Sequence, residues 1–143
     1  MNDVFEAELE DVYRYRLSYG GQSPFFFGLQ EGKLIASCCS GCGHVWLPFR
    51  PVCSRCYSEA APKELSGKGE ILTVIKLPMV PEHLQHLNRT VASALVLPEG
   101  ANTCLKAYFV GEETQLVKGA RVEAHYLPDP TTIADFYFAP EAD

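Results

Sequence analysis

The chain has 143 residues, enough for one domain or for two small modules that share a core without needing disulfides. Its formal net charge of -6 opposes general nucleic-acid binding, which depends on neutralising phosphates. No apolar run approaches the roughly eighteen residues of a membrane span, and the start of the chain has no basic or apolar signal region. We therefore expect a soluble cytoplasmic protein whose cysteines stay reduced.

The first predicted element is a helix over residues 4–17. Its apolar residues recur at helical spacing, acidic residues fill its first turns, and basic residues lie at its end, as the helix dipole favours. A pair of glycines ends it, and a second helix is predicted over residues 24–30, starting at a proline. With a short strand at 33–36, these elements predict an N-terminal helical segment over residues 1–36.

The most informative stretch contains two C-x-x-C pairs, Cys39 with Cys42 and Cys53 with Cys56. This spacing lets both sulfurs of a pair point at one ion, and two pairs supply the four thiolates that tetrahedral zinc favours. The sequence therefore predicts structural Zn²⁺ in a ribbon over residues 37–62, with a short hairpin between the pairs. Iron fits the same four sulfurs and remains an alternative.

Two residues beside these pairs could alter the ligand set, and a third bears on the second turn. Cys38 could replace Cys39 at C-x3-C spacing, but Cys39 is favoured because its spacing matches that of the second pair. His44 could also bind the ion, yet four cysteines already complete a zinc shell, so an exposed imidazole is expected. Tyr57 follows the second pair, where a glycine would adopt the turn more easily. Residues 58–62 are predicted to form a linker.

The ribbon region is locally positive on an acidic protein. Between Lys33 and Arg55 there is no carboxylate, whereas Lys33, Arg50 and Arg55 are all basic. Such a stretch suits a small phosphorylated ligand or an acidic partner surface. A solvated ribbon face explains the same charges equally well.

The rest of the chain is predicted to be β structure. Strands are predicted at 71–77, 90–97, 103–110, 121–126 and 133–138, with a turn or short helix at 112–116. Five strands in this order predict a small closed barrel of the OB type over residues 63–143, including a C-terminal tail. The predicted fold class is thus mostly β with N-terminal helices: a rubredoxin-like zinc ribbon followed by a five-stranded OB-fold barrel. Cys104 lies within the third strand and is predicted to be a buried small hydrophobe.

The order of the predicted elements and motifs along the chain identifies a protein family more specifically than any one of them does. The pieces lie at 24–29, 31–34, 39–43, 47–56, 67–70, 116–122 and 136–140. Together they resemble the bacterial and archaeal zinc-ribbon/OB-fold proteins associated with acyl-CoA metabolism, long catalogued as a domain of unknown function. Phe49, Tyr57 and the additional Cys38 depart from that family's usual pattern, and none of them removes a cysteine of the two pairs.

The resemblance implies a helper rather than an enzyme. Members of that family look like small subunits that dock onto thiolases or thiolase-like acyltransferases, with zinc in a structural role. The implied function is a non-catalytic accessory subunit that helps form or gate an acyl-CoA site. The sequence agrees, because it lacks a G-x-S-x-G elbow, a phosphate loop and an H-E-x-x-H motif.

This hypothesis assigns further residues. Lys33, Arg50 and Arg55 are predicted to contact the phosphates of CoA, a ligand shared with the thiolase-type partner. Phe136 and Phe138 are predicted to pack against that partner, and closing the barrel is an equally good role for at least one of them. Two other functions remain open. OB barrels and ribbons also serve as single-stranded nucleic-acid modules, and four cysteines also suit a rubredoxin-like electron carrier.

Overall fold

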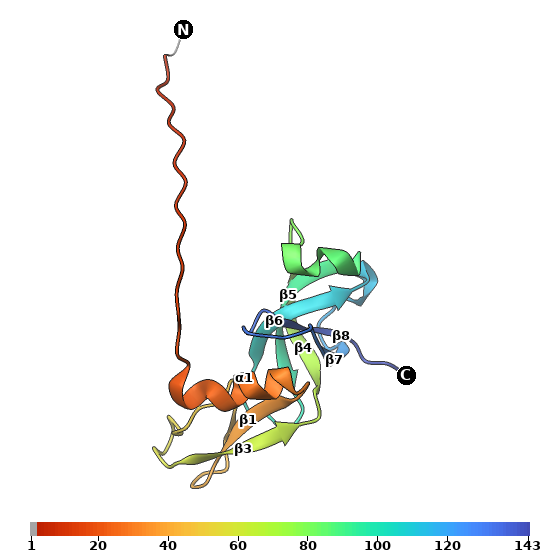
Figure 1. The fold of residues 1–143 in the computed structure, drawn as a ribbon. Coiled ribbons are helices and arrows are strands. Elements are labelled where there is room, and N and C mark those ends of the chain that lie inside the picture. Colours follow the sequence, from red (N-terminus) through yellow and green to blue (C-terminus); the bar gives the residue numbers. More distant parts are fainter. Residues whose placement is uncertain (1–2) are drawn as a thin grey trace.

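The computed structural model describes residues 3–143, and two β structures follow one another in it (Figure 1). A three-stranded sheet has the strand order β2-β1-β3, and a closed barrel has the order β4-β5-β6-β8-β7. The helices are η1 (Gly20–Gln22), α1 (Ser23–Gln30), η2 (Glu82–Leu87) and η3 (Glu113–Gln115). The strands are β1 (Leu34–Cys39), β2 (Val45–Trp46), β3 (Ala60–Leu65), β4 (Lys68–Lys76), β5 (Thr90–Pro98), β6 (Leu105–Gly111), β7 (Arg121–Tyr126) and β8 (Phe136–Pro140).

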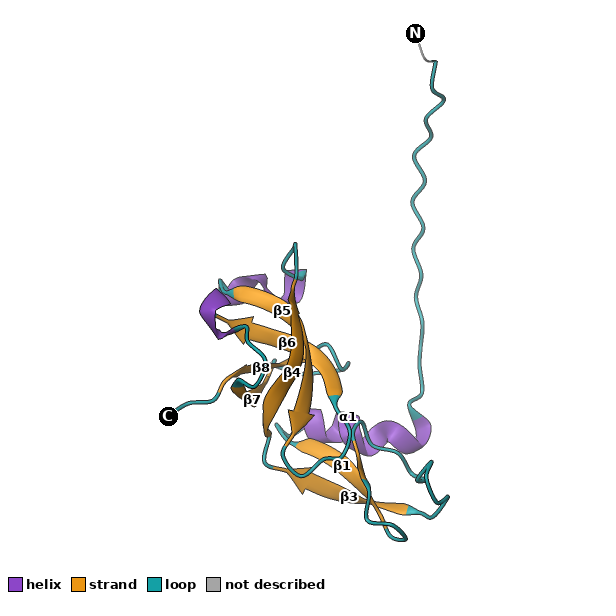
Figure 2. Ribbon diagram, turned by 180° about the vertical axis from the view of Figure 1, so that it is seen from behind, coloured by secondary structure: helices purple, strands orange, loops and turns teal. Residues whose placement is uncertain are grey.

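The predicted helix over residues 4–17 is wrong. Residues 3–19 form no helix and run as an extended, exposed chain into η1 (Figure 2), while residues 1 and 2 lie outside the described part. An isolated helix of this length is marginal in water, because most helical stability in proteins comes from packing an apolar face. Within the described structure nothing covers that face, so local periodicity alone does not hold the helix.

The second predicted helix is α1, which lies along β1 (Figure 1). Phe25 and Leu29 are buried on its inner face. Gly28 allows the close approach, because a Cβ there would overlap the side chain of Ile35. This contact fixes α1 on the sheet that leads into the cysteines.

The ribbon sheet contains a strand that the sequence did not suggest. A linker is predicted at residues 58–62, but Ala60–Leu65 is β3 and pairs with β1 along its whole length. Pro62 lies opposite Ser37 on an edge strand, where a proline is tolerated because one side of the strand needs no ladder donors. Only Leu65 of β3 is buried, so the strand has no alternation of apolar and polar residues by which the sequence could reveal it.

The barrel has the strand order of an OB fold. All its strand pairs are antiparallel except β6 with β8, and the pairing of β4 with β7 closes it. The alternating stretch 121–126 is a strand with the predicted bounds. The predicted fold class is confirmed. No helix in the described residues is long and apolar enough to cross a membrane.

One hydrophobic core joins helix, ribbon and barrel. It includes Phe25 from α1, Leu47 from the ribbon, and Phe109 from the barrel. The prediction that Phe136 and Phe138 contact a partner is wrong, since both side chains are 0% exposed and pack within this core. Their i,i+2 spacing places both on the inner face of β8.

The prediction for Cys104 is also wrong. Cys104 is exposed and precedes β6, which begins at Leu105. The strand starts later than its apolar pattern suggested, so the thiol lies on the loop between β5 and β6.

Candidate metal centre and basic face

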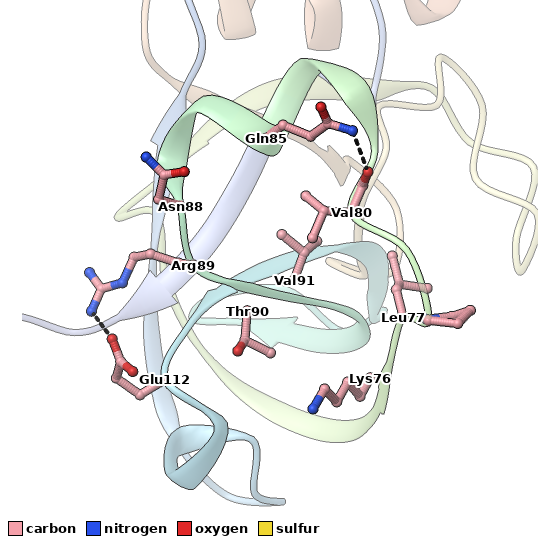
Figure 3. A pocket seen from close by; sticks show the side chains of 10 residues that line it. Lys76, Leu77, Val80, Gln85, Asn88, Arg89, Thr90, Val91 and Glu112 are labelled. Atoms are coloured by element: carbon pink, nitrogen blue, oxygen red, sulfur yellow. Dashed lines mark hydrogen bonds and ion pairs between the residues drawn. The ribbon is translucent and has the colours of Figure 1, made fainter.

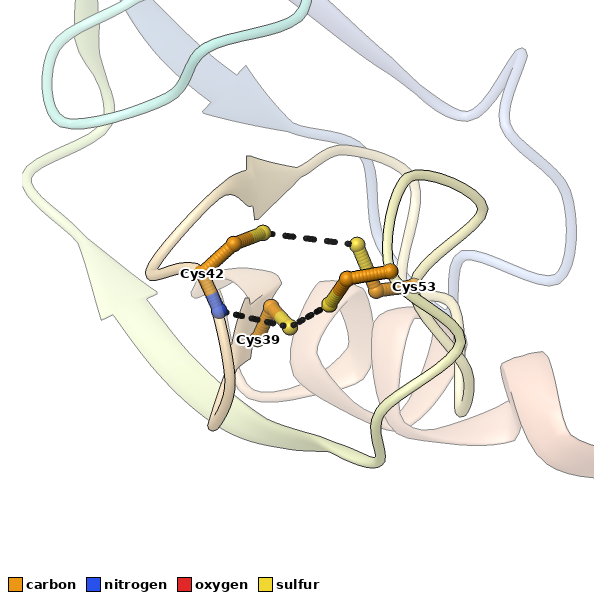
Figure 4. Close-up of side chains that lie close together, drawn as sticks. Cys39, Cys42 and Cys53 are labelled. Atoms are coloured by element: carbon orange, nitrogen blue, oxygen red, sulfur yellow. Dashed lines mark hydrogen bonds between the residues drawn. The ribbon is translucent and has the colours of Figure 1, made fainter.

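The four cysteines of the two C-x-x-C pairs converge from two separate loops. Their Sγ atoms all lie within 4.8 Å of one another. Figure 4 shows the side chains of Cys39, Cys42 and Cys53 turned toward a common centre. The Sγ–Sγ distance is 3.3 Å between Cys39 and Cys56 and 3.7 Å between Cys42 and Cys53. Four thiolates at about 2.3 Å from a tetrahedral zinc would be about 3.8 Å apart. The cluster therefore has the dimensions of a four-sulfur site for a structural metal ion.

Both loops have the same local geometry. The amide of Gly43 donates to the carbonyl of Cys39 at 3.0 Å, and that of Tyr57 donates to the carbonyl of Cys53 at 2.9 Å. Gly43 has φ 72° and Tyr57 has φ 62°, so each turn needs a left-handed residue at the same place. The second turn thus holds a non-glycine residue in a conformation that L-residues disfavour.

Backbone amides point at the sulfurs. Gly41 and Cys42 donate N–H groups to Cys39 Sγ at 3.3 and 3.4 Å, and Arg55 donates to Cys53 Sγ at 3.4 Å. Burial alone would raise the pKa of Cys53, but hydrogen bonds from the backbone amides of Arg55 and Cys56, and from the side chains of Trp46 and Cys42, outweigh it and lower the pKa to about 6. Hydrogen bonding by backbone amides to a thiolate is the arrangement expected around a ligand sulfur.

The fourth sulfur behaves in the opposite way. The backbone of His44 acts to lower the pKa of Cys42, but burial and the three neighbouring thiols outweigh it and raise the pKa to about 11. Four thiolates this close together repel one another. A cation at their centre removes this repulsion, because a coordinated thiol is deprotonated outright.

Neither Cys38 nor His44 belongs to this cluster. Cys38 pairs with Val45 in the sheet, and its Sγ lies 3.8 Å from the carbonyl oxygen of Gly43. The imidazole of His44 is half-buried rather than fully exposed, with its ring centroid 4.4 Å from that of Trp46.

Four side chains beside the cluster form what we call the basic face: Arg50, Trp46, His44 and Arg55. The guanidinium of Arg50 lies 4.7 Å from the centroid of the Trp46 ring, and Arg55 Nη1 donates to His44 Nδ1 at 2.9 Å. The indole Nε1 of Trp46 donates to Cys53 Sγ at 3.4 Å, so the face is attached directly to a cluster sulfur. Among the described residues, neither arginine forms an ion pair with a carboxylate.

The structure does not bring Lys33 to this face. Lys33 precedes β1 and pairs with Glu31 at 3.4 Å. The basic face adjoins the other end of β1, since the amide of Arg50 donates to Ser37 Oγ at 3.0 Å. Ser37 is four positions after Lys33, which is roughly 13 Å along an extended strand. Of the three predicted phosphate contacts, only Arg50 and Arg55 lie together.

The barrel carries two clefts that sequence reasoning missed. One, of about 540 Å³, lies beside η2 and is lined by Lys76, Val80, Arg89 and Glu112 among others (Figure 3). Arg89 pairs with Glu112 at 2.8 Å. The other, of about 350 Å³, is lined by residues including Tyr108. The residues that line each cleft come from segments far apart in the chain, so no local sequence motif predicts either cleft.

Comparison with known proteins shows that the ribbon is similar to a known zinc-ribbon domain. The family model described as "ChsH2, rubredoxin-like zinc ribbon domain" matches residues 28–60. A DUF35 domain-containing scaffold protein of Methanocaldococcus jannaschii is 33% identical over 70 residues, which are 48% of this chain and 50% of that protein. The chain thus spans about half the length of that curated relative.

Two solved structures share the fold across most of the chain. The structure titled "Ltp2-ChsH2(DUF35) aldolase" matches with a TM-score of 0.67 at 20% identity, covering 89% of this chain and 98% of the matched chain. A DUF35-family protein of unknown function from Sulfolobus solfataricus matches with a TM-score of 0.65 at 20% identity, covering 86% and 85%. With the ribbon match and the archaeal relative, these likenesses confirm the resemblance of the chain to the zinc-ribbon/OB-fold family that its sequence suggested.

Proposed function

We propose that this protein is a non-catalytic accessory subunit of a thiolase-type acyl-CoA acyltransferase complex, where it helps form or gate the acyl-CoA site. The observation that carries the proposal is the match in fold to 98% of the chain in a structure titled as an Ltp2-ChsH2(DUF35) aldolase. That title pairs a DUF35 protein with a second protein under one activity. A relative described as a scaffold protein supports the same division of labour.

In this proposal the metal is structural. Cys39, Cys42, Cys53 and Cys56 would bind Zn²⁺, and four protein ligands leave no open position for a substrate or an activated water. The ion would hold the two loops together, and with them the residues that those loops present. Trp46 and Arg55 both donate to Cys53 Sγ, so the orientation of the basic face depends on the integrity of the metal centre.

The basic face would contact the phosphates of CoA. Arg50 and Arg55 are exposed and belong to a stretch without carboxylates, so their charge is available to an anion. Guanidinium groups bind phosphate through paired N–H donors in a fixed geometry. The acyl group and the reacting atoms would then belong to the partner's site.

The first experiment identifies the partner. The full-length protein is tagged, purified from its own cells without disrupting complexes, and its companions are identified by mass spectrometry. Recovery of a thiolase-type or other acyl-CoA enzyme is expected. Absence of any acyl-CoA enzyme from the purified complex, or turnover of a thioester by the isolated chain, would overturn the proposal.

The second experiment tests the basic face within that complex. Arg50→Gln and Arg55→Gln are each expected to weaken CoA binding by about 10- to 100-fold, the range for a lost hydrogen bond to a charged group. Lys33→Gln is the matched control, because Lys33 is equally basic and exposed but lies at the other end of β1. Equal losses for all three variants would indicate a general charge effect and remove the basic face from the site.

A further inference from the structure

The smaller of the two barrel clefts, which we call the Tyr108 cleft, has the size and lining of a small-molecule site. Its volume of about 350 Å³ lies within the range of roughly 300–1,000 Å³ that is usual for such sites. Its lining residues come from the end of β4, from β5, from β6 and from the loop before β8: Leu77, Ser93, Lys106, Ala107, Tyr108, Ile133 and Ala134.

The floor of the Tyr108 cleft is a part of the barrel surface that η2 leaves uncovered. Because side chains alternate along a strand, Lys106, Tyr108 and Val110 all lie on the outer face of β6. Val110 is buried together with Leu84 of η2, Tyr108 is half-buried and Lys106 is exposed. Ser93 of β5 lies directly opposite Tyr108. The apolar layer beneath η2 therefore continues into an open cleft.

The walls of the cleft are held in place by their own contacts. Nε2 of His83, on η2, lies 2.9 Å from the carbonyl oxygen of Ala134, on the opposite wall. The His83 ring also packs near that of Tyr108, with centroids 5.7 Å apart. In the loop before β8, the carboxylate of Asp135 accepts from the amides of residues 131 and 132 at 2.8 Å. Because these contacts already order the walls, a ligand would lose little affinity to ordering them.

Lys106 gives the cleft a positive charge that no neighbour neutralises. It is the only charged residue among those that line the cleft in the described structure. Within residues 68–143, only Lys106 and Lys118 among the basic side chains form no ion pair with a carboxylate. Lys118 does not line the cleft. The Tyr108 cleft thus combines apolar walls with one available cation.

The larger cleft beside η2 offers no comparable charge. Its two basic residues are both paired, Arg89 with Glu112 at 2.8 Å and Lys76 with Glu113 at 3.0 Å. Figure 3 shows the first of these pairs at the edge of that cleft. An anion entering there would have to displace a carboxylate, so the Tyr108 cleft is the better anion site of the two.

We propose that the Tyr108 cleft binds a small monocarboxylate, with Lys106 against the carboxylate group and the apolar walls around a hydrocarbon chain. One lysine suits a single negative charge, whereas phosphate groups are typically held by the paired donors of arginine. The inference is separate from the proposed function, because the cleft belongs entirely to this chain and shares no residue with the basic face.

Single-stranded nucleic acid, which many OB barrels bind, fits this cleft less well. Such binding uses a groove with several cations along the phosphates and exposed aromatic rings on which the bases stack. The Tyr108 cleft is lined by one lysine and one half-buried tyrosine. The net charge of -6 also opposes it.

Nuclear magnetic resonance tests the inference on the full-length, zinc-loaded protein. The ¹⁵N-labelled protein is titrated with sodium octanoate, with sodium acetate, which has the charge without the chain, and with octan-1-ol, which has the chain without the charge. Octanoate should shift the amides of residues 93, 106–108, 133 and 134, octan-1-ol should shift the same amides at higher concentration, and acetate should shift none of them. Octanoate shifts confined to other residues, or no shifts below the concentration at which octanoate forms micelles, would overturn the inference.

Variants separate the roles of charge and chain. Lys106→Gln should weaken octanoate binding about tenfold and leave octan-1-ol binding unchanged. Lys118→Gln is the matched control, because it removes the other unpaired lysine of the barrel and should change neither. Ile133→Ser, at a side chain that is 38% exposed, should weaken the binding of both probes without preventing folding, which circular dichroism checks.

The length of the chain gives a further test. Butyrate, hexanoate and octanoate should bind progressively more tightly, by up to about fourfold for each methylene group that the cleft buries. Equal effects of Lys106→Gln and Lys118→Gln on octanoate binding, or an affinity that does not depend on chain length, would show that the cleft is not a carboxylate site.

Discussion

The two cysteine loops offer an internal comparison, because equivalent turns contain Gly43 in one and Tyr57 in the other. Both residues have positive φ, 72° and 62°. A left-handed conformation costs an L-residue about 1–2 kcal/mol. A Cβ at Gly43 would meet no atom within 4 Å, so Gly43→Ala adds this conformational cost without a clash. Alanine recovers about 0.4–1 kcal/mol by restricting the unfolded chain, which leaves a net destabilisation of about 0.5–1.5 kcal/mol.

Tyr57→Gly should have the opposite sign. The Tyr57 side chain is 81% exposed, so its removal sacrifices little packing, and the turn loses its left-handed penalty. We expect the free energy of unfolding to rise by about 0.5–1 kcal/mol. For a chain of this size, each kcal/mol raises Tm by roughly 2–4 °C. Circular dichroism during heating measures both shifts, and competition with a chromophoric chelator measures metal retention.

Gly119→Ala is the control for this pair. Gly119 has φ 86°, and a Cβ there would likewise meet no atom within 4 Å, but the residue lies in the turn before β7, away from the cysteines. Its substitution should lower Tm by a similar amount without changing the affinity of the folded protein for metal. An unchanged Tm and unchanged metal retention in Gly43→Ala, or a lower Tm in Tyr57→Gly, would refute the reasoning from φ.

Two further predictions concern the metal and pH. The purified protein should be colourless and contain one Zn²⁺ per chain. The Cys53→Ser variant should lose the ion and much of its thermal stability, whereas the Cys38→Ser variant should keep both. Elemental analysis that finds iron, or that finds metal retained by Cys53→Ser, would contradict this prediction. Hydrogen bonds from Lys68 and then Arg121 lower the pKa of Glu141, so its contribution to stability is present above the ordinary carboxyl pKa and is lost as pH falls through the folded-state value. Glu141→Gln should therefore lower Tm at pH 7, and the difference from the unaltered protein should vanish in acid; a difference independent of pH would exclude the ion pairs as its cause.

The barrel could be predicted because its signals are local. Residues 121–126 alternate along their whole length, and the alternation arises from one face that packs inward. The same rule, applied to residues 136 and 138, would have placed both phenylalanines on one face and therefore in the core. The four cysteines were equally accessible to prediction, since the spacing of each pair fixes the direction of its sulfurs.

The errors have non-local causes. Whether residues 4–17 form a helix depends on a covering surface, which the segment's own sequence does not contain. Whether residues 60–65 form a strand depends on β1, which lies more than twenty residues earlier. Lys33 and Arg50 share a stretch of positive charge in the sequence, yet β1 separates them in space. Sequence proximity predicted the charge of the region but not which charges meet.

The ribbon and barrel are joined by the loop between β5 and β6. The amide of Asn102 donates to the carbonyl of Val45 at 3.0 Å, and the amide of Val45 donates to Asn102 Oδ1 at 2.9 Å. Leu47 makes a similar exchange with Thr103, donating to Oγ1 at 2.9 Å and accepting from it at 3.2 Å. The loop thus serves β2 as a neighbouring strand would, and it fixes the ribbon against the barrel.

This junction determines whether metal binding stabilises the barrel as well as the ribbon. Asn102→Ala leaves the amide of the buried Val45 without its acceptor and should cost about 1–3 kcal/mol. Asn102→Asp keeps the acceptor oxygen and should retain most of that stability. Because core residues of both parts belong to one cluster, calorimetry of the zinc-loaded protein should show a single transition that chelation moves to lower temperature as a whole. Two transitions, with the barrel's unaffected by chelation, would mean that the metal orders only its own loops and that the basic face is free to move relative to the barrel.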